Sequence, residues 1–193
     1  GRILRVERGK YALTDNPYLV ASNLIYPSYV SFLSAFAYRG LTSQIIREIQ
    51  VVSSRRKRGL EFSGFKIVFI RFSPLRIFGF VREELEGKYL FVAEVEKAVI
   101  DSLYLPKYCP ISEVLDVVRE ADVDNRKLVT YAIRMRSSVT LKRLGYILEL
   151  AGVDIYTQIG SLLNRKYDPL NPLLPRTGKK NKKWRLIVNE VLE

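Results

Sequence analysis

Strand-type and helix-type residue patterns occupy separate parts of this 193-residue chain. Residues 65–72 form an aromatic and β-branched run that is typical of a mostly buried strand. Further β-rich runs lie at 47–54, 77–84 and 88–92. Later in the chain, apolar residues recur at helical spacing over 93–105, 112–121, 125–136 and 138–151. Strands followed by a series of helices predict an α+β fold.

The two ends of the chain add further strands. Residues 3–6 and 10–14 alternate apolar with polar side chains on either side of Arg8-Gly9, which predicts a β-hairpin. An isolated hairpin is unstable in water, so it must pack against another part of the protein. Toward the other end we expect a helix from Asp154 to Leu163, a loop over 168–183 and a final strand over 184–192.

Local signals predict where several elements begin. Asp15 is expected to cap a short helix, and Ser28 to cap a second helix that ends at Gly40. The basic tetrad at 55–58 is expected to connect the strands at 47–54 and 65–72 as a hairpin. The N-cap candidates for the later helices are Ser112, Asp124 or Asn125, and Ser138.

The composition excludes several classes of protein. Hydrophobic residues make up 48% of the chain, so it is not a disordered segment. The single cysteine, Cys109, cannot form an internal disulfide, which fits a reducing, cytoplasmic setting. The sequence has neither an apolar run long enough to span a membrane nor a signal peptide. It has no histidine, which removes Ser-His-Asp and Cys-His catalysis and most zinc sites. We expect no cofactor and no metal.

Positive charge is concentrated in three segments. The formal net charge is +12, and residues 2–10, 55–58 and 165–185 carry +3, +4 and +7, which leaves the rest of the chain at −2. Basic clusters on loops and turns suit contact with nucleic-acid phosphates, although any one cluster can also be a solvated loop. The predicted DNA-binding residues are Arg2, Arg5, Arg8, Lys10, Arg55, Arg56, Lys57, Arg58, Lys179, Lys180, Lys182 and Lys183.

An enzyme is the alternative. A minimal nucleotidyltransferase carries Gly-Ser followed by Asp-x-Asp, whereas Gly160-Ser161 is followed only by Asp168. A metal-dependent nuclease would need acids and a lysine that converge in a cleft, and the candidates are Glu94, Glu96, Lys97 and Asp101. The same residues also fit an ordinary helix start, with Lys97 paired to Asp101. Cys109 has no histidine base and is expected to be a buried thiol. A basic module that binds an acidic protein is a further alternative.

Three segments together resemble a known family. They are YPSYVSFLSAFAYRGLT at 26–42, VAEVEKAVIDSLYLP at 92–106 and LKRLGYILELAG at 141–152, preceded by Arg-Gly-x-Tyr at 8–11. In this order and spacing they resemble the AbiEi family of antitoxin transcriptional regulators from type IV, abortive-infection toxin–antitoxin systems. The resemblance covers residues 2–152, with a weaker similarity in the Lys-rich loop and at 184–189.

The resemblance implies a domain organisation and a function. Residues 1–15 would be the wing hairpin of an N-terminal winged-helix DNA-binding domain, whose recognition helix would precede Gly1, and residues 16–193 would form the AbiEi-like antitoxin domain. The protein would be a non-catalytic regulator that binds double-stranded operator DNA, represses its own operon and counteracts a nucleotidyltransferase toxin. A wing carries affinity for DNA more readily than specificity.

Overall fold

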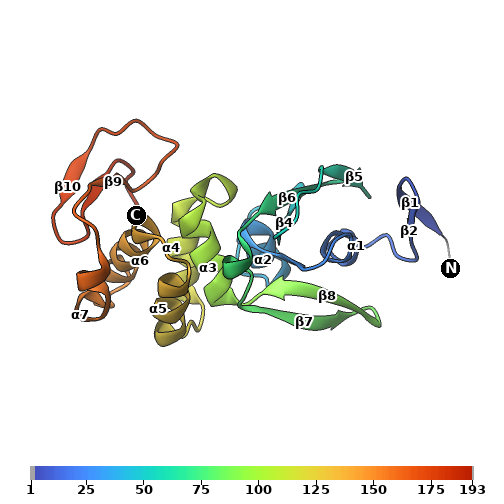
Figure 1. The fold of residues 1–193 in the computed structure, drawn as a ribbon, viewed down its shortest axis with the longest axis horizontal. Coiled ribbons are helices and arrows are strands. Elements are labelled where there is room, and N and C mark those ends of the chain that lie inside the picture. The colour runs from blue at the N-terminus through green and yellow to red at the C-terminus, as the bar shows by residue number, and fades with distance from the viewer. Residues whose placement is uncertain (1–2, 193) are drawn as a thin grey trace. The chain divides into compact units, whose positions relative to one another are not determined.

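The computed structural model describes residues 3–192 and confirms the α+β class (Figure 1). The chain divides into two compact units, Gly1–Val95 and Glu96–Glu193. The N-terminal hairpin lies in the same compact unit as the large sheet. The boundary after residue 15 that the family resemblance implies, between a winged-helix domain and an antitoxin domain, stays a prediction.

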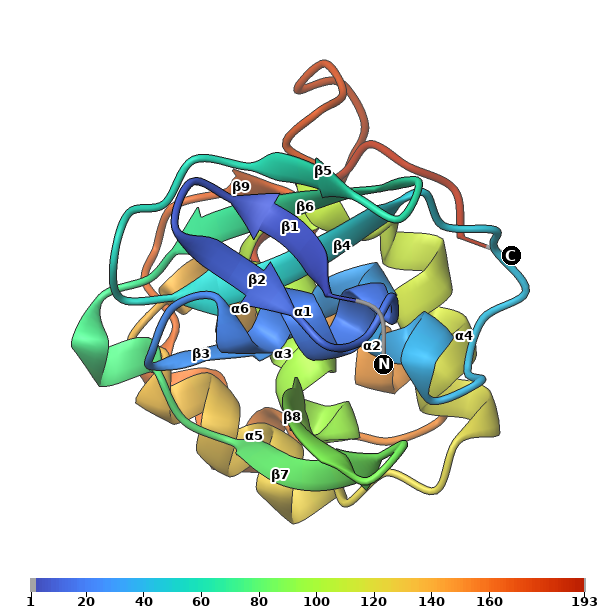
Figure 2. The ribbon, with the colours of Figure 1, turned by 90° about the vertical axis from the view of Figure 1, so that its right-hand side faces the viewer.

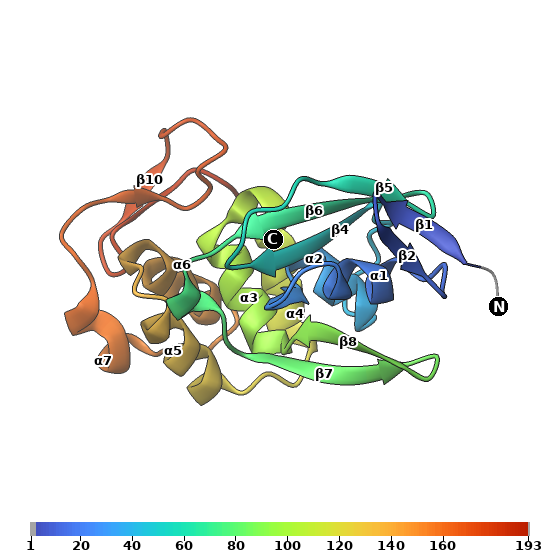
Figure 3. The same ribbon diagram turned by 45° about the vertical axis from the view of Figure 1, so that its right-hand side comes forward.

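The first unit contains a hairpin, a six-stranded sheet and two short helices. Its strands are β1 (Leu4–Glu7), β2 (Lys10–Ala12), β3 (Ser28–Val30), β4 (Glu48–Ser53), β5 (Leu60–Phe62), β6 (Phe65–Arg71), β7 (Phe80–Leu85) and β8 (Lys88–Ala93). Its helices are α1 (Pro17–Asn23), α2 (Phe32–Tyr38) and the 3₁₀ turn Pro74–Arg76. The sheet has the order β5-β6-β4-β3-β8-β7. In Figures 2 and 3, β4 to β6 pass on one side of α1 and α2 and β7 to β8 pass on the other, so the sheet curls around the helices.

Burial of apolar side chains explains this arrangement. The interior of the unit contains Tyr29, Phe32, Phe36, Ile49 and Ile67, all fully buried. The Tyr29 ring stacks on Phe80 at a centroid distance of 4.8 Å, and this contact ties β3 to the edge strand β7. Stacked aromatic pairs add to the stabilisation that burial provides.

Several sequence predictions for this unit need correction. The cap of α1 is Asn16 rather than Asp15, because the Asn16 side chain accepts hydrogen bonds from the backbone of Tyr18 and Leu19. Ser28 does not start a helix. Residues 28–30 form β3, because pairing with β4 on one side and β8 on the other outweighs the helical spacing of the sequence.

The connection between β4 and β6 was also predicted wrongly. These strands are parallel, with Ile49 opposite Ile67, and so cannot be joined by a hairpin turn. The tetrad instead leads into β5, which pairs antiparallel with β6 through a turn at Ser63-Gly64. The hairpin prediction failed because it did not include the short strand β5, which lies between the tetrad and β6 and pairs with β6. The expected strands at 77–84 and 88–92 are confirmed as β7 and β8.

The second unit is mainly helical. It contains α3 (Val95–Tyr104), α4 (Ile111–Glu120), α5 (Asn125–Arg134), α6 (Ser138–Leu150), α7 (Tyr156–Ile159) and the 3₁₀ turns Pro106–Tyr108 and Gly160–Leu162. A small sheet of order β10-β11-β9 follows, from β9 (Asp168–Pro169), β10 (Lys179–Asn181) and β11 (Leu186–Val188). The four long helices were predicted correctly, as was the Asp124 cap. The other two caps were not, because Pro110 precedes α4 and Ser137 caps α6.

Two adjacent buried cations on α6 hold the C-terminal segment. The Lys142 ammonium donates to Asn164 Oδ1, the Lys166 carbonyl and Asp168 Oδ2 at 2.6–2.7 Å. The Arg143 guanidinium donates to three carbonyl oxygens, those of Leu103, Pro169 and Leu170. Burial lowers the Arg143 pKa to about 10, so this group stays charged at neutral pH. The segment 168–183, expected to be a loop, is therefore fixed at its start by α6, and it contains the strands β9 and β10. The final strand expected over 184–192 is the shorter β11.

Candidate nucleic-acid interface

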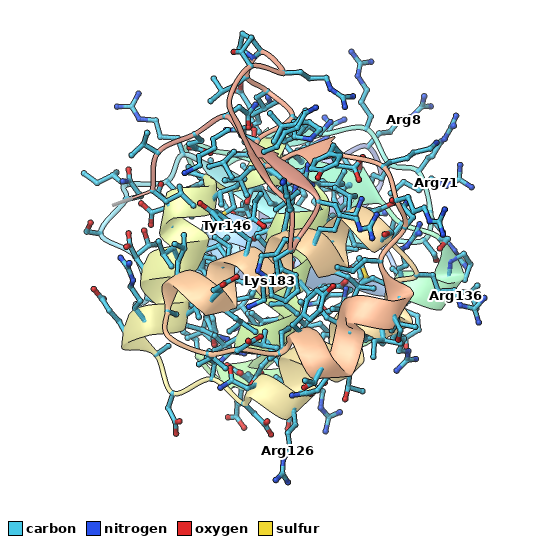
Figure 4. The ribbon with its side chains drawn as sticks, turned by 90° about the vertical axis from the view of Figure 1, so that its left-hand side faces the viewer. Arg8, Arg71, Arg126, Arg136, Tyr146 and Lys183 are labelled. Atoms are coloured by element: carbon cyan, nitrogen blue, oxygen red, sulfur yellow. The ribbon has the colours of Figure 1, made fainter. Side chains whose placement is uncertain are left out.

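The N-terminal hairpin presents two arginines to solvent. β1 and β2 pair antiparallel with Arg5 opposite Tyr11, and the turn at Arg8-Gly9 uses the positive φ of Gly9 (+75°). Both Arg5 and Arg8 are exposed, and Figure 4 shows the Arg8 side chain projecting outward. The hairpin prediction is confirmed. Arg2, a further predicted contact, lies outside the described residues.

A shared glutamate joins this hairpin to the basic tetrad. Both Glu7 carboxylate oxygens lie 2.7 Å from Lys57 Nζ, and Lys10 Nζ lies 2.9 Å from Glu7 Oε1. The hydrogen bond from Lys57, followed by that from Lys10, lowers the pKa of Glu7 below its usual value. Lys10 also donates to the Leu24 carbonyl at 2.9 Å. The hairpin is therefore held against the sheet by side chains at its turn.

The tetrad itself runs along the outer edge of the sheet before β5 begins. Lys57 Nζ lies 5.6 Å from the centroid of the Phe69 ring on β6, and its side chain is only 14% exposed. The other three members, Arg55, Arg56 and Arg58, are exposed. The tetrad thus divides into one lysine that anchors the segment and three arginines that face solvent.

Together the two segments form what we call the arginine edge: Arg5, Arg8, Arg55, Arg56 and Arg58. Each of these arginines lies within two residues of Glu7 or Lys57, so the ion pair brings all five into one region. Within residues 3–192, no carboxylate pairs with any of the five side chains. Guanidinium groups without an acidic partner are available to bind phosphate.

Sequence reasoning missed one nearby arginine. Arg71 ends β6 opposite Ser53, two residues before the tetrad, and it is exposed. Figure 4 shows its side chain pointing outward. The only signal in the sequence was a charged residue at the end of an apolar strand, and the parallel pairing that places it beside the tetrad was not foreseen.

The third basic cluster lies in the second unit. Lys179 and Lys180 on β10 are exposed, as is Lys182, and Lys180 Nζ lies 5.4 Å from the Tyr167 ring centroid. Lys183, labelled in Figure 4, differs from them, because it pairs with Glu149 at 3.1 Å and Asp154 at 3.0 Å. The bond to Asp154 is the main cause that raises the pKa of Lys183. Lys183 is therefore mainly a structural anchor for the turn that follows β10.

Three of the four residues of the nuclease alternative, Glu96, Lys97 and Asp101, are buried. Lys97 and Asp101 are fully buried and form an ion pair with each other. Glu96 accepts a hydrogen bond from the Asp124 backbone at 3.1 Å, at the start of α5. Over residues 3–192, no group of three or more acidic or cysteine side chains is placed to hold a metal ion. Cys109 is buried, and burial raises its pKa to about 12.

The length and apolar character of the described helices bear on whether one of them could span a membrane. Over residues 3–192, none combines the length and the apolar character that a membrane span requires.

The fold and the basic edge define an α+β protein with exposed arginines grouped beside a curled mixed sheet. Neither a family model nor a curated protein matches the sequence. Among solved structures, the chain is similar to the RV2827C protein from Mycobacterium tuberculosis, with a TM-score of 0.67 and 14% sequence identity. The match covers 96% of this chain and 75% of the RV2827C chain, and it shows a shared fold.

Proposed function

We propose that this protein is a non-catalytic, DNA-binding antitoxin of the AbiEi type that works in the cytoplasm. The hairpin at residues 1–15 acts as the wing of a winged-helix domain, and the arginine edge contacts the phosphates of duplex operator DNA. The remainder of the chain counteracts a nucleotidyltransferase toxin. The family part of this proposal rests on the sequence resemblance at 8–11, 26–42, 92–106 and 141–152.

One observation carries the DNA-binding part. The Glu7–Lys57 ion pair groups five exposed arginines, none paired with a described carboxylate, on two segments that are far apart in the sequence. A duplex carries one phosphate charge for about every 1.7 Å of its axis, so a short patch of guanidinium groups can meet several phosphates together. Such contacts supply affinity and orientation rather than sequence specificity.

The test is the salt dependence of duplex binding. The variant Arg55→Gln, Arg56→Gln, Arg58→Gln removes three phosphate contacts and leaves the Glu7–Lys57 pair in place. We expect the slope of log affinity against log salt to fall by about 2–3, since each neutralised phosphate contributes about 0.9. Fluorescence anisotropy with a labelled duplex measures this slope.

The matched control removes the same charge elsewhere. Lys107→Gln, Arg126→Gln, Arg136→Gln changes three exposed cations of the second unit, two of which are labelled in Figure 4. We expect this control to change the slope by less than about 1. Equal slopes for the two variants would refute the assignment of the arginine edge, because net charge alone would then explain binding.

The antitoxin part is tested separately in cells. Co-expression of the chain with a nucleotidyltransferase toxin encoded beside it should restore growth, and the triple arginine variant should restore growth equally well. This is expected because the arginine edge is assigned to DNA and not to the toxin. Growth that stays inhibited in the presence of the folded chain would refute the antitoxin part alone.

A further inference from the structure

A groove beside the hairpin has no role in the proposed DNA contact. It has a volume of about 710 Å³ and is bounded by β2, α1 and the start of β8. Its apolar lining includes Val6, Ala12, Leu13, Leu19, Val20 and Leu24. The groove therefore lies within the first unit, next to the arginine edge but with a different chemistry.

Large apolar side chains around this groove are exposed to water. Leu13 is 68% exposed, Tyr11 65% and Tyr89 50%. Single exposed apolar residues are common on protein surfaces, whereas several around one concave site mark a place where another molecule binds. Tyrosine is also enriched where partner proteins are anchored.

The charges around the groove select the partner. Lys10 and Lys88 line it, and no acidic side chain does. Lys10 is already paired with Glu7, but Lys88 has no carboxylate partner within residues 3–192. In addition, the Arg82 guanidinium lies 4.4 Å from the Tyr89 ring centroid. A ligand that fits this groove must bring apolar side chains for the walls and a carboxylate for Lys88.

We infer that this groove is a docking site for a second protein, which inserts an amphipathic segment with apolar residues on one side and an acidic residue near Lys88. A single-stranded nucleic acid fits less well, because the lining has six aliphatic side chains and only two rings, Tyr11 and Tyr89, on which bases can stack. The inference goes beyond the proposed function, since it gives the first unit a protein partner beside its DNA contact.

The test uses three short fluorescein-labelled peptides: one of leucine and glutamate, one of serine and glutamate, and one of leucine and lysine. Anisotropy with the full chain should show the leucine–glutamate peptide binding at least about tenfold more tightly than either other peptide. Leu13→Asp and Lys88→Glu should each weaken that binding by about tenfold. The matched control is Leu75→Asp, because Leu75 is 63% exposed on the same unit and does not line the groove. It should leave binding unchanged.

Several outcomes would overturn the inference. Equal binding of the serine–glutamate peptide would show that basic surface charge suffices, and equal losses for Leu13→Asp and Leu75→Asp would show that the groove is not used. If a labelled single-stranded DNA bound the parent chain and Leu13→Asp, but not Leu75→Asp, abolished that binding, the groove would be assigned to nucleic acid. A doubled mass in sedimentation that Leu13→Asp abolishes would assign it to a second copy of this chain. Lys88 lies on β8, outside the hairpin and the arginine edge, so Lys88→Gln should weaken peptide binding and leave duplex affinity unchanged. Failure of the groove is therefore distinguishable from failure of the proposed function.

Discussion

Replacing Gly145 with alanine should destabilise the second unit, although alanine is the better helix former. Gly145 lies in α6, and a Cβ atom placed on it would be 2.0 Å from Cζ3 of Trp184 and 2.3–2.4 Å from two other ring carbons. The Trp184 ring is fully buried, and its Nε1 donates to the Glu149 carboxylate. No small adjustment relieves contacts this short, so the ring must leave its place.

The magnitude follows from two opposing effects. Displacing a buried tryptophan costs about 3–5 kcal/mol, by comparison with truncation of such a side chain. Exchanging glycine for alanine inside a helix returns about 1 kcal/mol. We therefore expect Gly145→Ala to lower the free energy of unfolding by about 2–4 kcal/mol.

Urea denaturation followed by tryptophan fluorescence measures this change at the site itself, because Trp184 is the only tryptophan in the chain. We expect a lower midpoint and a native emission spectrum shifted to the red, since the ring gains contact with water. In a double-mutant cycle read by circular dichroism, Gly145→Ala should add little to the cost of Trp184→Leu, because the smaller side chain leaves room for the methyl group. A variant as stable as the parent, or about 1 kcal/mol more stable, would refute the reasoning.

Three further predictions concern other contacts. Glu7→Gln removes the charged acceptor of Lys57, so hairpin amides should exchange with deuterium about two- to fivefold faster. Acidification should have the same effect, because folding lowers the pKa of Glu7. The stabilisation that Glu7 provides is complete above its ordinary pKa and is lost as the pH falls through the lower pKa of the folded state. Lys142→Met leaves Asp168 without its buried partner and should cost about 3–5 kcal/mol in thermal unfolding, whereas the same change at exposed Lys179 should cost little. Cys109 should react with a thiol reagent only after unfolding, because burial raises its pKa to about 12, and rapid reaction of the native chain would contradict its placement.

The helices of the second unit could be predicted because their information is local. Apolar residues at helical spacing identified α3 to α6, and the Asp124 cap was found from its position before α5. In the first unit the decisive information is not local. Residues 28–30 follow helical spacing in sequence, yet Tyr29 and Val30 are buried in a strand with neighbours on both sides. Pairing with distant strands cannot be derived from a short window.

The basic segments were found from sequence, but the roles of their members were not. The interpretation treated Lys10, Lys57 and Lys183 as DNA contacts, whereas each is paired with a carboxylate in the structure. The partners of Lys57 and Lys183 lie 50 and 29–34 positions away in the sequence, so neither pair could be inferred from spacing. In the same way, nothing in the sequence marked Lys142 as a buried cation, because its acceptors come from residues 164–168.

The Glu7 ion pair organises the arginine edge without neutralising it. One carboxylate shared by two lysines leaves the described parts of the hairpin and tetrad, residues 3–10 and 55–58, with seven cations and one anion, a formal charge of +6. The pair uses lysines, whose compact ammonium groups suit a buried or half-buried contact with a single carboxylate. The arginines have no carboxylate partner among residues 3–192, and planar guanidinium groups suit phosphate because they can form two parallel hydrogen bonds with it. An arrangement in which Glu7 paired with the arginines would hold the hairpin equally well but would leave only lysines for the phosphates. Lysines that pair with Glu7 and arginines that face solvent are therefore the feature that most favours DNA contact at this edge.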